Sequence, residues 1–271
     1  MRSSKYWSFI LLLALAVSSC NMDAVREEAD ALYQEGEYEA AAAKYDRVIK
    51  MEPSNHFALY NRGRALEEIG EYDRAYSDFS NLLTLRKNTR MALMARARCS
   101  YKLENYKGSI MDLNILVKQE PDNIEAKQLR GNSWLRLGKA DKALNDLVQV
   151  VNEDPTNIHA LISTGAAYAR VGLGPTAIRY FDQALSIQPD LPVAYFNRGV
   201  VYFHHEFWSE AMENFEKALD LNPEYGEVHT RVGMVKLNDN RYSQSQACAD
   251  FKVGAKYGDE LATEYLKEFC R

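Results

Sequence analysis

Small residues recur every 34 positions along most of this chain, and this period constrains the possible folds more than any other feature of the sequence. Five prolines follow the same period, and Lys87 occupies the one empty place in their series. Two series with a common period and a fixed offset indicate an internal repeat whose copies share one small structure. The small residues are Ala29, Gly63, Ala97, Gly131, Gly165, Gly199 and Gly233, and the prolines are Pro53, Pro121, Pro155, Pro189 and Pro223.

The copy over residues 192–223 shows most clearly what one repeat contains. Tyr195, Gly199 and Tyr202 are spaced four and three residues apart, which places them on one face of a helix. A second helical pattern follows and ends before Pro223, because proline cannot continue a helix. Glycine inside a helix costs roughly 1 kcal/mol relative to alanine, so Gly199 predicts a close contact between the two helices. Small residues mark the second helix at Ala41, Ala75, Ser109, Ala143, Ala177 and Ala211, and larger ones at Tyr45, Phe79, Leu113, Leu147, Phe181 and Phe215.

A helix-turn-helix of 34 residues with these markers resembles the tetratricopeptide repeat. The tryptophan and leucine that are frequent early in the family's first helix are mostly replaced here, for example by Tyr195 and Arg198. The resemblance implies an all-α fold: a right-handed α-solenoid of about seven repeats with a C-terminal capping helix. We expect one solenoid domain over residues 22–257, because repeat arrays bury one continuous core between neighbouring copies. Its repeats are 22–55, 56–89, 90–123, 124–157, 158–191, 192–225 and 226–257.

The first nineteen residues have the pattern of an export signal. Arg2 and Lys5 precede an apolar run over residues 9–17, which is short for a membrane span. The run ends in Val17-Ser18-Ser19-Cys20, which resembles the processing motif of bacterial lipoproteins. We therefore expect a signal peptide over residues 1–19, a lipid on Cys20 and a short tether over 20–23; the alternative is ordinary signal cleavage beside an incidental cysteine. This resemblance implies a membrane-anchored protein of the cell envelope, facing the periplasm or the surface, with the outer membrane favoured over the inner.

The charge of the chain argues against a nucleic-acid partner. The formal net charge is −5, and it becomes more negative when Arg2 and Lys5 leave with the signal. Nucleic-acid binding depends on basic contacts to phosphate. We therefore expect a protein or peptide partner and contact with the membrane only through the lipid.

The end of the chain predicts a capping helix over residues 258–271 and a disulfide. Asp259 is a favourable N-cap residue, and the helix after it carries an apolar stripe of the kind that covers the open end of a repeat array. Cys248 and Cys270 are equidistant in sequence from Asp259, so an antiparallel hairpin would place them at the same height. We expect them to form a disulfide, since an exported chain reaches a compartment where disulfides persist; the alternative is two reduced thiols packed apart.

The sequence does not predict an enzyme, a metal site or a cofactor. His204, His205 and Glu206 are the main cluster of possible ligands, but neighbouring residues on a helix point about 100° apart, whereas helix-borne ligands usually sit three or four apart. Gly172 and Gly174 fall in a turn within a repeat and lack the preceding strand of a phosphate-binding loop. No CxxC or GxSxG motif is present.

The resemblance to tetratricopeptide repeats implies a scaffold that binds a partner in a concave groove lined by the first helix of each repeat. An adaptor for envelope assembly is one version; a carbohydrate-capture lipoprotein is an alternative, although the aromatic residues coincide with expected core positions. Chaperone-binding members of the family clamp a carboxylate with lysine, asparagine and arginine. Asn61, Asn197 and Arg231 match parts of that pattern, but the remaining places do not, so a full clamp is not expected.

A second apolar stripe on the first helices is the candidate partner-binding surface. In the sixth repeat this stripe is separate from Tyr195, Gly199 and Tyr202, and one helix rarely needs two apolar stripes to pack its own repeat. The stripe is expected to become more apolar away from the N-terminus; the alternative is that adjacent repeats cover these side chains as additional core. The candidate residues are Met91, Met94, Tyr101, Leu135, Ile162, Val193, Phe196, Val200, Phe203, Met234 and Leu237.

Overall fold

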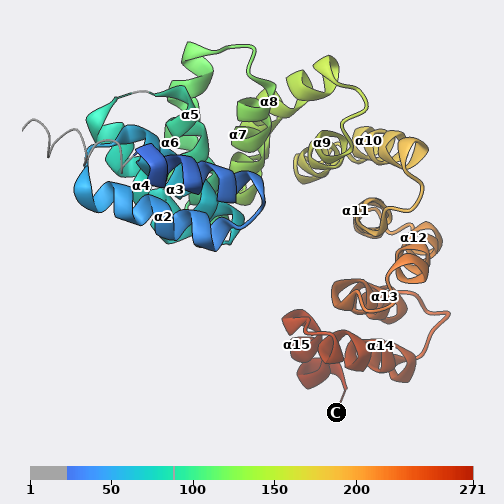
Figure 1. Ribbon diagram of the computed structural model, residues 1–271. Coiled ribbons are helices and arrows are strands. Elements are labelled where there is room, and N and C mark those ends of the chain that lie inside the picture. The colour runs from blue at the N-terminus through green and yellow to red at the C-terminus, as the bar shows by residue number, and fades with distance from the viewer. Residues whose placement is uncertain (1–22, 88, 271) are drawn as a thin grey trace, which may run out of the picture. The chain divides into compact units, whose positions relative to one another are not determined.

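The computed structural model describes residues 23–87 and 89–270, and within them the chain forms helices and no strand (Figure 1). The predicted signal peptide and Cys20 lie outside the described residues. Residues 23–34 form the first helix. The helices that follow are α2 (Tyr38–Met51), α3 (His56–Glu68), α4 (Tyr72–Leu85), α5 (Arg90–Lys102), α6 (Tyr106–Gln119), α7 (Ile124–Arg136), α8 (Ala140–Glu153), α9 (Ile158–Arg170), α10 (Gly174–Ile187), α11 (Pro192–His204), α12 (Trp208–Leu221), α13 (Gly226–Asn238), α14 (Gln244–Lys256) and α15 (Glu260–Phe269).

The helices pack in pairs, as the 34-residue period predicts. Within a repeat, α3 contacts α4, α5 contacts α6, α9 contacts α10, α11 contacts α12, and α13 contacts α14. Within each body, neighbouring pairs also pack on one another, for example α4 on α5 and α12 on α13. The predicted all-α repeat solenoid with a C-terminal capping helix is therefore confirmed. The contacts group the chain into an N-terminal body that ends at Ser133 and a C-terminal body that begins at Trp134.

The glycines of the 34-residue series lie where the two helices of a repeat touch. A Cβ added to Gly199 would lie 2.7 Å from Cε1 of Phe215, which is fully buried. Gly165 has the same relation to Phe181, also at 2.7 Å. The prediction that Gly165 and Gly199 mark a close helix contact is confirmed. In each repeat the aromatic ring of the second helix occupies the space that a side chain at the glycine would need.

Gly199→Leu is expected to lower the free energy of unfolding by about 1–3 kcal/mol, because the added side chain would collide with Phe215, which is fully buried. Chemical denaturation would measure the change. A double-mutant cycle isolates the contact: Gly199→Ala combined with Phe215→Leu should destabilise by less than the sum of the single changes. Additive effects, or a Gly199→Leu protein as stable as wild type, would contradict this interpretation.

Arginines at the seventh position of several first helices join neighbouring helices by hydrogen bonds that the sequence analysis did not anticipate. Arg62 on α3 donates to Asp78 on α4, with 2.8 Å between Nε and Oδ2, and pairs also with Asp46 on α2. Arg96 repeats the arrangement with Asp112, at 2.8 Å. Burial raises the pKa of Asp78, while the bonds from Arg62 oppose that rise. These pairs tie α3 to α4 and α5 to α6, and Arg62 also reaches back to the preceding repeat.

Candidate functional site

The largest hollow among those found in the N-terminal body lies along its first helices. Its volume is about 890 Å³, and its walls come from α3, α5, the end of α6, the start of α7 and the turn between α4 and α5. It is lined by Tyr60, Arg86, Lys87, Thr89, Arg90, Met91, Met94, Arg98, Leu116, Glu120, Asn123 and Glu125.

The floor of this hollow is apolar. Leu116 and Met94 are nearly fully buried there, at 1% and 8% exposure, and belong to one apolar cluster with Leu113 and Ala126. Met91 stands on the rim with 62% of its side chain exposed. An exposed methionine next to a buried apolar floor can contact a partner side chain, because its flexible thioether adapts to different shapes.

Two of the four cations around the hollow are bound by carboxylates of the protein. Arg98 donates to both oxygens of Glu67, at 2.7 and 3.1 Å, and these bonds raise the pKa of Arg98 further above its usual value. Arg90 pairs with Glu120 at 2.7 Å. Glu120 also accepts from Asn123 at 2.8 Å, and these two partners lower its pKa, the bond from Asn123 most. These two arginines are partly neutralised before any partner arrives.

Arg86 and Lys87 are the two cations of the hollow that have no carboxylate partner among the described residues. Both side chains are exposed, and neither is paired with a carboxylate in the part of the chain that the structure describes. Arg86 directly follows α4, and its carbonyl accepts a hydrogen bond from the Thr89 hydroxyl at 2.9 Å. The turn therefore presents two free positive charges beside an apolar floor.

The candidate stripe of the sequence analysis is only partly exposed in the N-terminal body. Met91 and Met94 both line the hollow, but the expectation that Met94 is exposed is wrong, because it packs against Leu113 and Leu116. Tyr101 is half-buried near the end of α5, where its ring meets Tyr106 edge-on at 5.3 Å.

In the C-terminal body two members of the stripe are core, which corrects the expectation that these two line an exposed apolar groove. Phe196 is 7% exposed, because its ring packs between Phe215 of its own repeat and Tyr225, which precedes the first helix of the next. Leu135 is 8% exposed and packs against Leu147. These two side chains are thus covered as additional core, by residues of their own repeats and by Tyr225 at the junction with the next repeat.

The remaining members of the stripe lie between core and surface. Val193 is 38% exposed, whereas the others are half-buried. These half-buried residues are Ile162, Val200, Phe203, Met234 and Leu237. Conversely Tyr195 and Tyr202, expected in the core, are only half-buried. The expected increase in exposed apolar side chains toward the C-terminus does not hold.

Sequence matches and solved structures identify the repeat. Residues 26–85 and residues 192–225 each match a model described as tetratricopeptide repeat. The same helix pairs and the same 34-residue spacing continue between the two matched segments. These two segments are similar to tetratricopeptide repeats in sequence, and the described chain has the fold of a tetratricopeptide repeat array.

Solved structures of tetratricopeptide repeat proteins share its fold. One from Parabacteroides merdae is 21% identical, with a TM-score of 0.75, and the match covers 92% of this chain and 99% of that one. One from Cytophaga hutchinsonii is 15% identical, with a TM-score of 0.63 and coverage of 89% and 99%. YrrB, described as a tetratricopeptide repeat protein with an unusual peptide-binding site, is 20% identical, with a TM-score of 0.58 and coverage of 73% and 97%. No curated protein matches the sequence significantly.

The asparagines that resemble the carboxylate clamp of some tetratricopeptide repeats are engaged within the protein. The Asn61 amide donates to Asp30 at 3.2 Å, and the Asn197 amide donates to the carbonyl of Val193 at 2.8 Å, one turn earlier in its own helix. Arg231 lies 4.0 Å from Glu227. Local use of the two asparagines agrees with the expectation that a full clamp is absent.

Sequence reasoning missed several residues of the hollow, although signals for them were present. Lys87 takes the place of proline in the series of prolines that recurs every 34 residues. The replacement of proline by two cations in this one turn was the signal that pointed to Arg86 and Lys87.

At the C-terminal end, α15 closes the last helix pair, α13 and α14. Asp259 caps the helix by accepting from the backbone N–H of Leu261, as expected, and Ala262 is fully buried. Tyr265 stacks on Phe251, with ring centres 5.0 Å apart. The helix therefore covers the core of the last pair.

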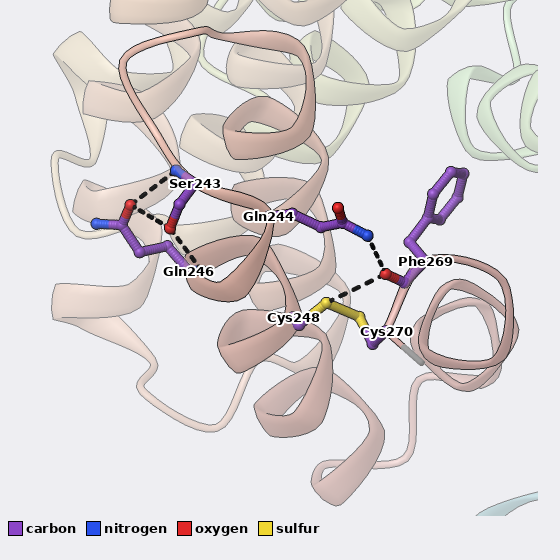
Figure 2. Close-up of a disulfide and its surroundings, with 6 residues drawn as sticks. All are labelled: Ser243, Gln244, Gln246, Cys248, Phe269 and Cys270. Carbon is purple, nitrogen blue, oxygen red and sulfur yellow. Dashed lines mark hydrogen bonds between the residues drawn. A yellow bond between two sulfur atoms is a disulfide. The ribbon is translucent and has the colours of Figure 1, made fainter.

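The structure joins Cys248 on α14 to Cys270 after α15 in a disulfide, with the two Cα atoms 5.6 Å apart (Figure 2). The amide of Gln244 donates to the carbonyl of Phe269 beside the bond. The third cysteine of the described residues, Cys99, is free and fully buried, and burial raises the pKa of its thiol to about 12.

Over residues 23–87 and 89–270, no three His, Cys, Asp or Glu side chains come together in a way that could hold a metal ion. In the same residues, no helix combines the length and apolar character needed to cross a membrane.

Proposed function

We propose that this protein is a lipid-anchored scaffold of the bacterial cell envelope that binds a partner protein or peptide in the hollow of its N-terminal body. The hollow carries this proposal: it combines an apolar floor, an exposed Met91 and free cations along the first helices. Interaction sites are often marked by exposed apolar side chains with a few anchors, surrounded by polar groups.

The envelope location rests on the processing motif that ends at Cys20 and on the disulfide. Cys248 and Cys270 are joined, and disulfides persist mainly in oxidising compartments outside the cytosol. The first described helix begins at residue 23, three positions after Cys20. Three residues span about 10 Å at most, so the lipid would hold the N-terminal body next to the membrane surface.

The anchor is tested by replacing Cys20. Cys20→Ala is expected to abolish incorporation of labelled fatty acid and to move the protein from the membrane fraction to the soluble fraction. Intact-mass spectrometry of the wild-type protein should show a chain that begins at Cys20 with a lipid attached. A wild-type N-terminus elsewhere, or without lipid, would overturn the lipid anchor and leave the binding surface unaffected.

Binding is tested by a matched pair of methionines in the same body. Met91→Glu places a charge on the rim of the hollow and is expected to abolish capture of the partner, with little effect on folding because Met91 is 62% exposed. Met111→Glu is the control, since Met111 on α6 is 68% exposed and does not line the hollow. Capture from envelope extracts, followed by mass spectrometry, should lose the same proteins with Met91→Glu only; equal capture by both variants would refute the site.

A further inference from the structure

We propose that the segment bound in the hollow is an acidic peptide with an apolar anchor, whose carboxylates pair with Arg86 and Lys87 and whose apolar side chain lies on Met91 and Met94. This inference rests on the proposed binding function and specifies the chemistry of the partner.

The turn between the second and third repeats differs in charge from the equivalent turns of the chain. Those turns carry proline, preceded in three of them by an acid: Glu52-Pro53, Glu120-Pro121 and Asp154-Pro155. Here the same two places hold Arg86 and Lys87, and Arg90 follows at the start of α5. The repeat forms with either an acidic or a basic residue at this turn, so the fold does not require the positive charge of Arg86 and Lys87.

The hollow holds more positive charge than its own carboxylates neutralise. Arg98 is bound to Glu67, and Arg90 to Glu120, whereas Arg86 and Lys87 have no such partner in residues 23–87 and 89–270. Arg90 is itself 64% exposed and can accept a second carboxylate. The whole chain carries a net charge of −5, so an acidic segment is repelled by most of the surface and attracted here.

The start of α5 adds to this positive potential. Asn55 caps α3 and Asn157 caps α9 by accepting a backbone N–H, but the side chain of Thr89 does not cap α5, because its hydroxyl donates to Arg86 instead. The first N–H groups of α5 thus receive no hydrogen bond from the side chain of their N-cap residue, and a helix N-terminus carries partial positive charge. This partial charge supplements the cations of Arg86, Lys87 and Arg90.

The apolar part of the partner follows from the floor of the hollow. Met94 and Leu116 form a buried surface, and Met91 projects beside it. A leucine or phenylalanine side chain would cover this surface, and carboxylates a few residues away would reach the turn. A purely acidic segment lacks this anchor, and a purely apolar one lacks the charge contacts.

Three synthetic peptides of twelve residues test the inference by fluorescence anisotropy. Each has the same phenylalanine and leucine anchors, separated in the first peptide by glutamate, in the second by glutamine and in the third by lysine. The glutamate peptide is expected to bind at least about tenfold more tightly than the glutamine peptide, which corresponds to about 1.4 kcal/mol, and the lysine peptide not to bind. Affinity for the glutamate peptide should fall as salt is raised, because the turn is exposed and its charges are screened.

Charge-reversal variants of the full chain identify the residues responsible. Arg86→Glu with Lys87→Glu should remove the preference for the glutamate peptide. The control, Arg47→Glu with Lys107→Glu, changes the net charge equally at exposed residues of the same body that do not line the hollow, and it should keep the preference. The exchange Arg86→Lys with Lys87→Arg should also keep it.

Each outcome of this experiment has one interpretation. Equal binding of the glutamate and glutamine peptides, lost in Met91→Glu, would overturn the acidic preference and leave the proposed binding site intact. Failure of all three peptides to bind would also overturn the acidic preference, and capture by Met91→Glu would then judge the site separately. A preference that survives Arg86→Glu with Lys87→Glu would overturn the assignment to this turn.

Discussion

Phe196→Ala is expected to lower the free energy of unfolding by about 3–5 kcal/mol, the range found when a buried phenylalanine is truncated in a core. The ring is 7% exposed and lies between Phe215, with ring centres 6.1 Å apart, and Tyr225, at 5.3 Å. Tyr225 belongs to the junction with the next repeat, so the substitution leaves a cavity at an interface between repeats. Loss of such an interface destabilises the array beyond a single repeat, since each repeat is stabilised by its neighbours.

Phe203→Ala is the matched control for this prediction. Phe203 lies two turns along the same helix, α11, and is half-buried with its ring edge-on to Trp208 at 5.2 Å. Its truncation should cost clearly less than that of Phe196, because part of its surface remains in water in the folded state. Urea denaturation of both variants measures the difference. A Phe196→Ala protein as stable as Phe203→Ala would show that the ring is not part of the core.

Removal of the disulfide by Cys248→Ser with Cys270→Ser is expected to cost about 3 kcal/mol. The bond closes a loop of 22 residues, and in the chain-entropy model this loop restricts the unfolded chain by that amount. The loss should appear first at α15, which is the last helix and is held otherwise by the packing of Ala262 and Tyr265. Hydrogen exchange of the α15 amides should therefore increase more than that of α13.

A reductant supplies the control for the disulfide. Dithiothreitol should lower the thermal midpoint of the wild-type protein toward that of the double serine variant and should not change the variant itself. The buried Cys99 does not complicate the comparison, because burial raises the pKa of its thiol to about 12 and keeps it protonated. Non-reducing mass spectrometry of protein from the native compartment should find Cys248 and Cys270 joined; two free thiols there would contradict the prediction.

The sequence by itself determined the repeat and much of its internal geometry. Copies of the repeat that have both markers place a glycine of the first helix against a phenylalanine of the second, as with Gly199 and Phe215. This contact is local, because it forms between two helices joined by a short turn. The cap of α15 is local in the same sense, because Asp259 accepts from Leu261 two residues later. Spacing and helix geometry are sufficient for features of this kind, since the interacting groups are close in the chain.

Only the tertiary structure decided which apolar stripe is buried and where the free charges lie. The sequence of α11 shows two stripes, but Phe196 is covered because Tyr225, at the junction with the next repeat, packs against it, and the spacing within α11 does not reveal that contact. Likewise Arg98 and Arg86 are both arginines near one hollow, yet Glu67 binds Arg98 from α3 while Arg86 has no carboxylate partner among the described residues. Burial and charge neutralisation depend on which side chains neighbouring repeats bring together, so they follow from the packing between repeats.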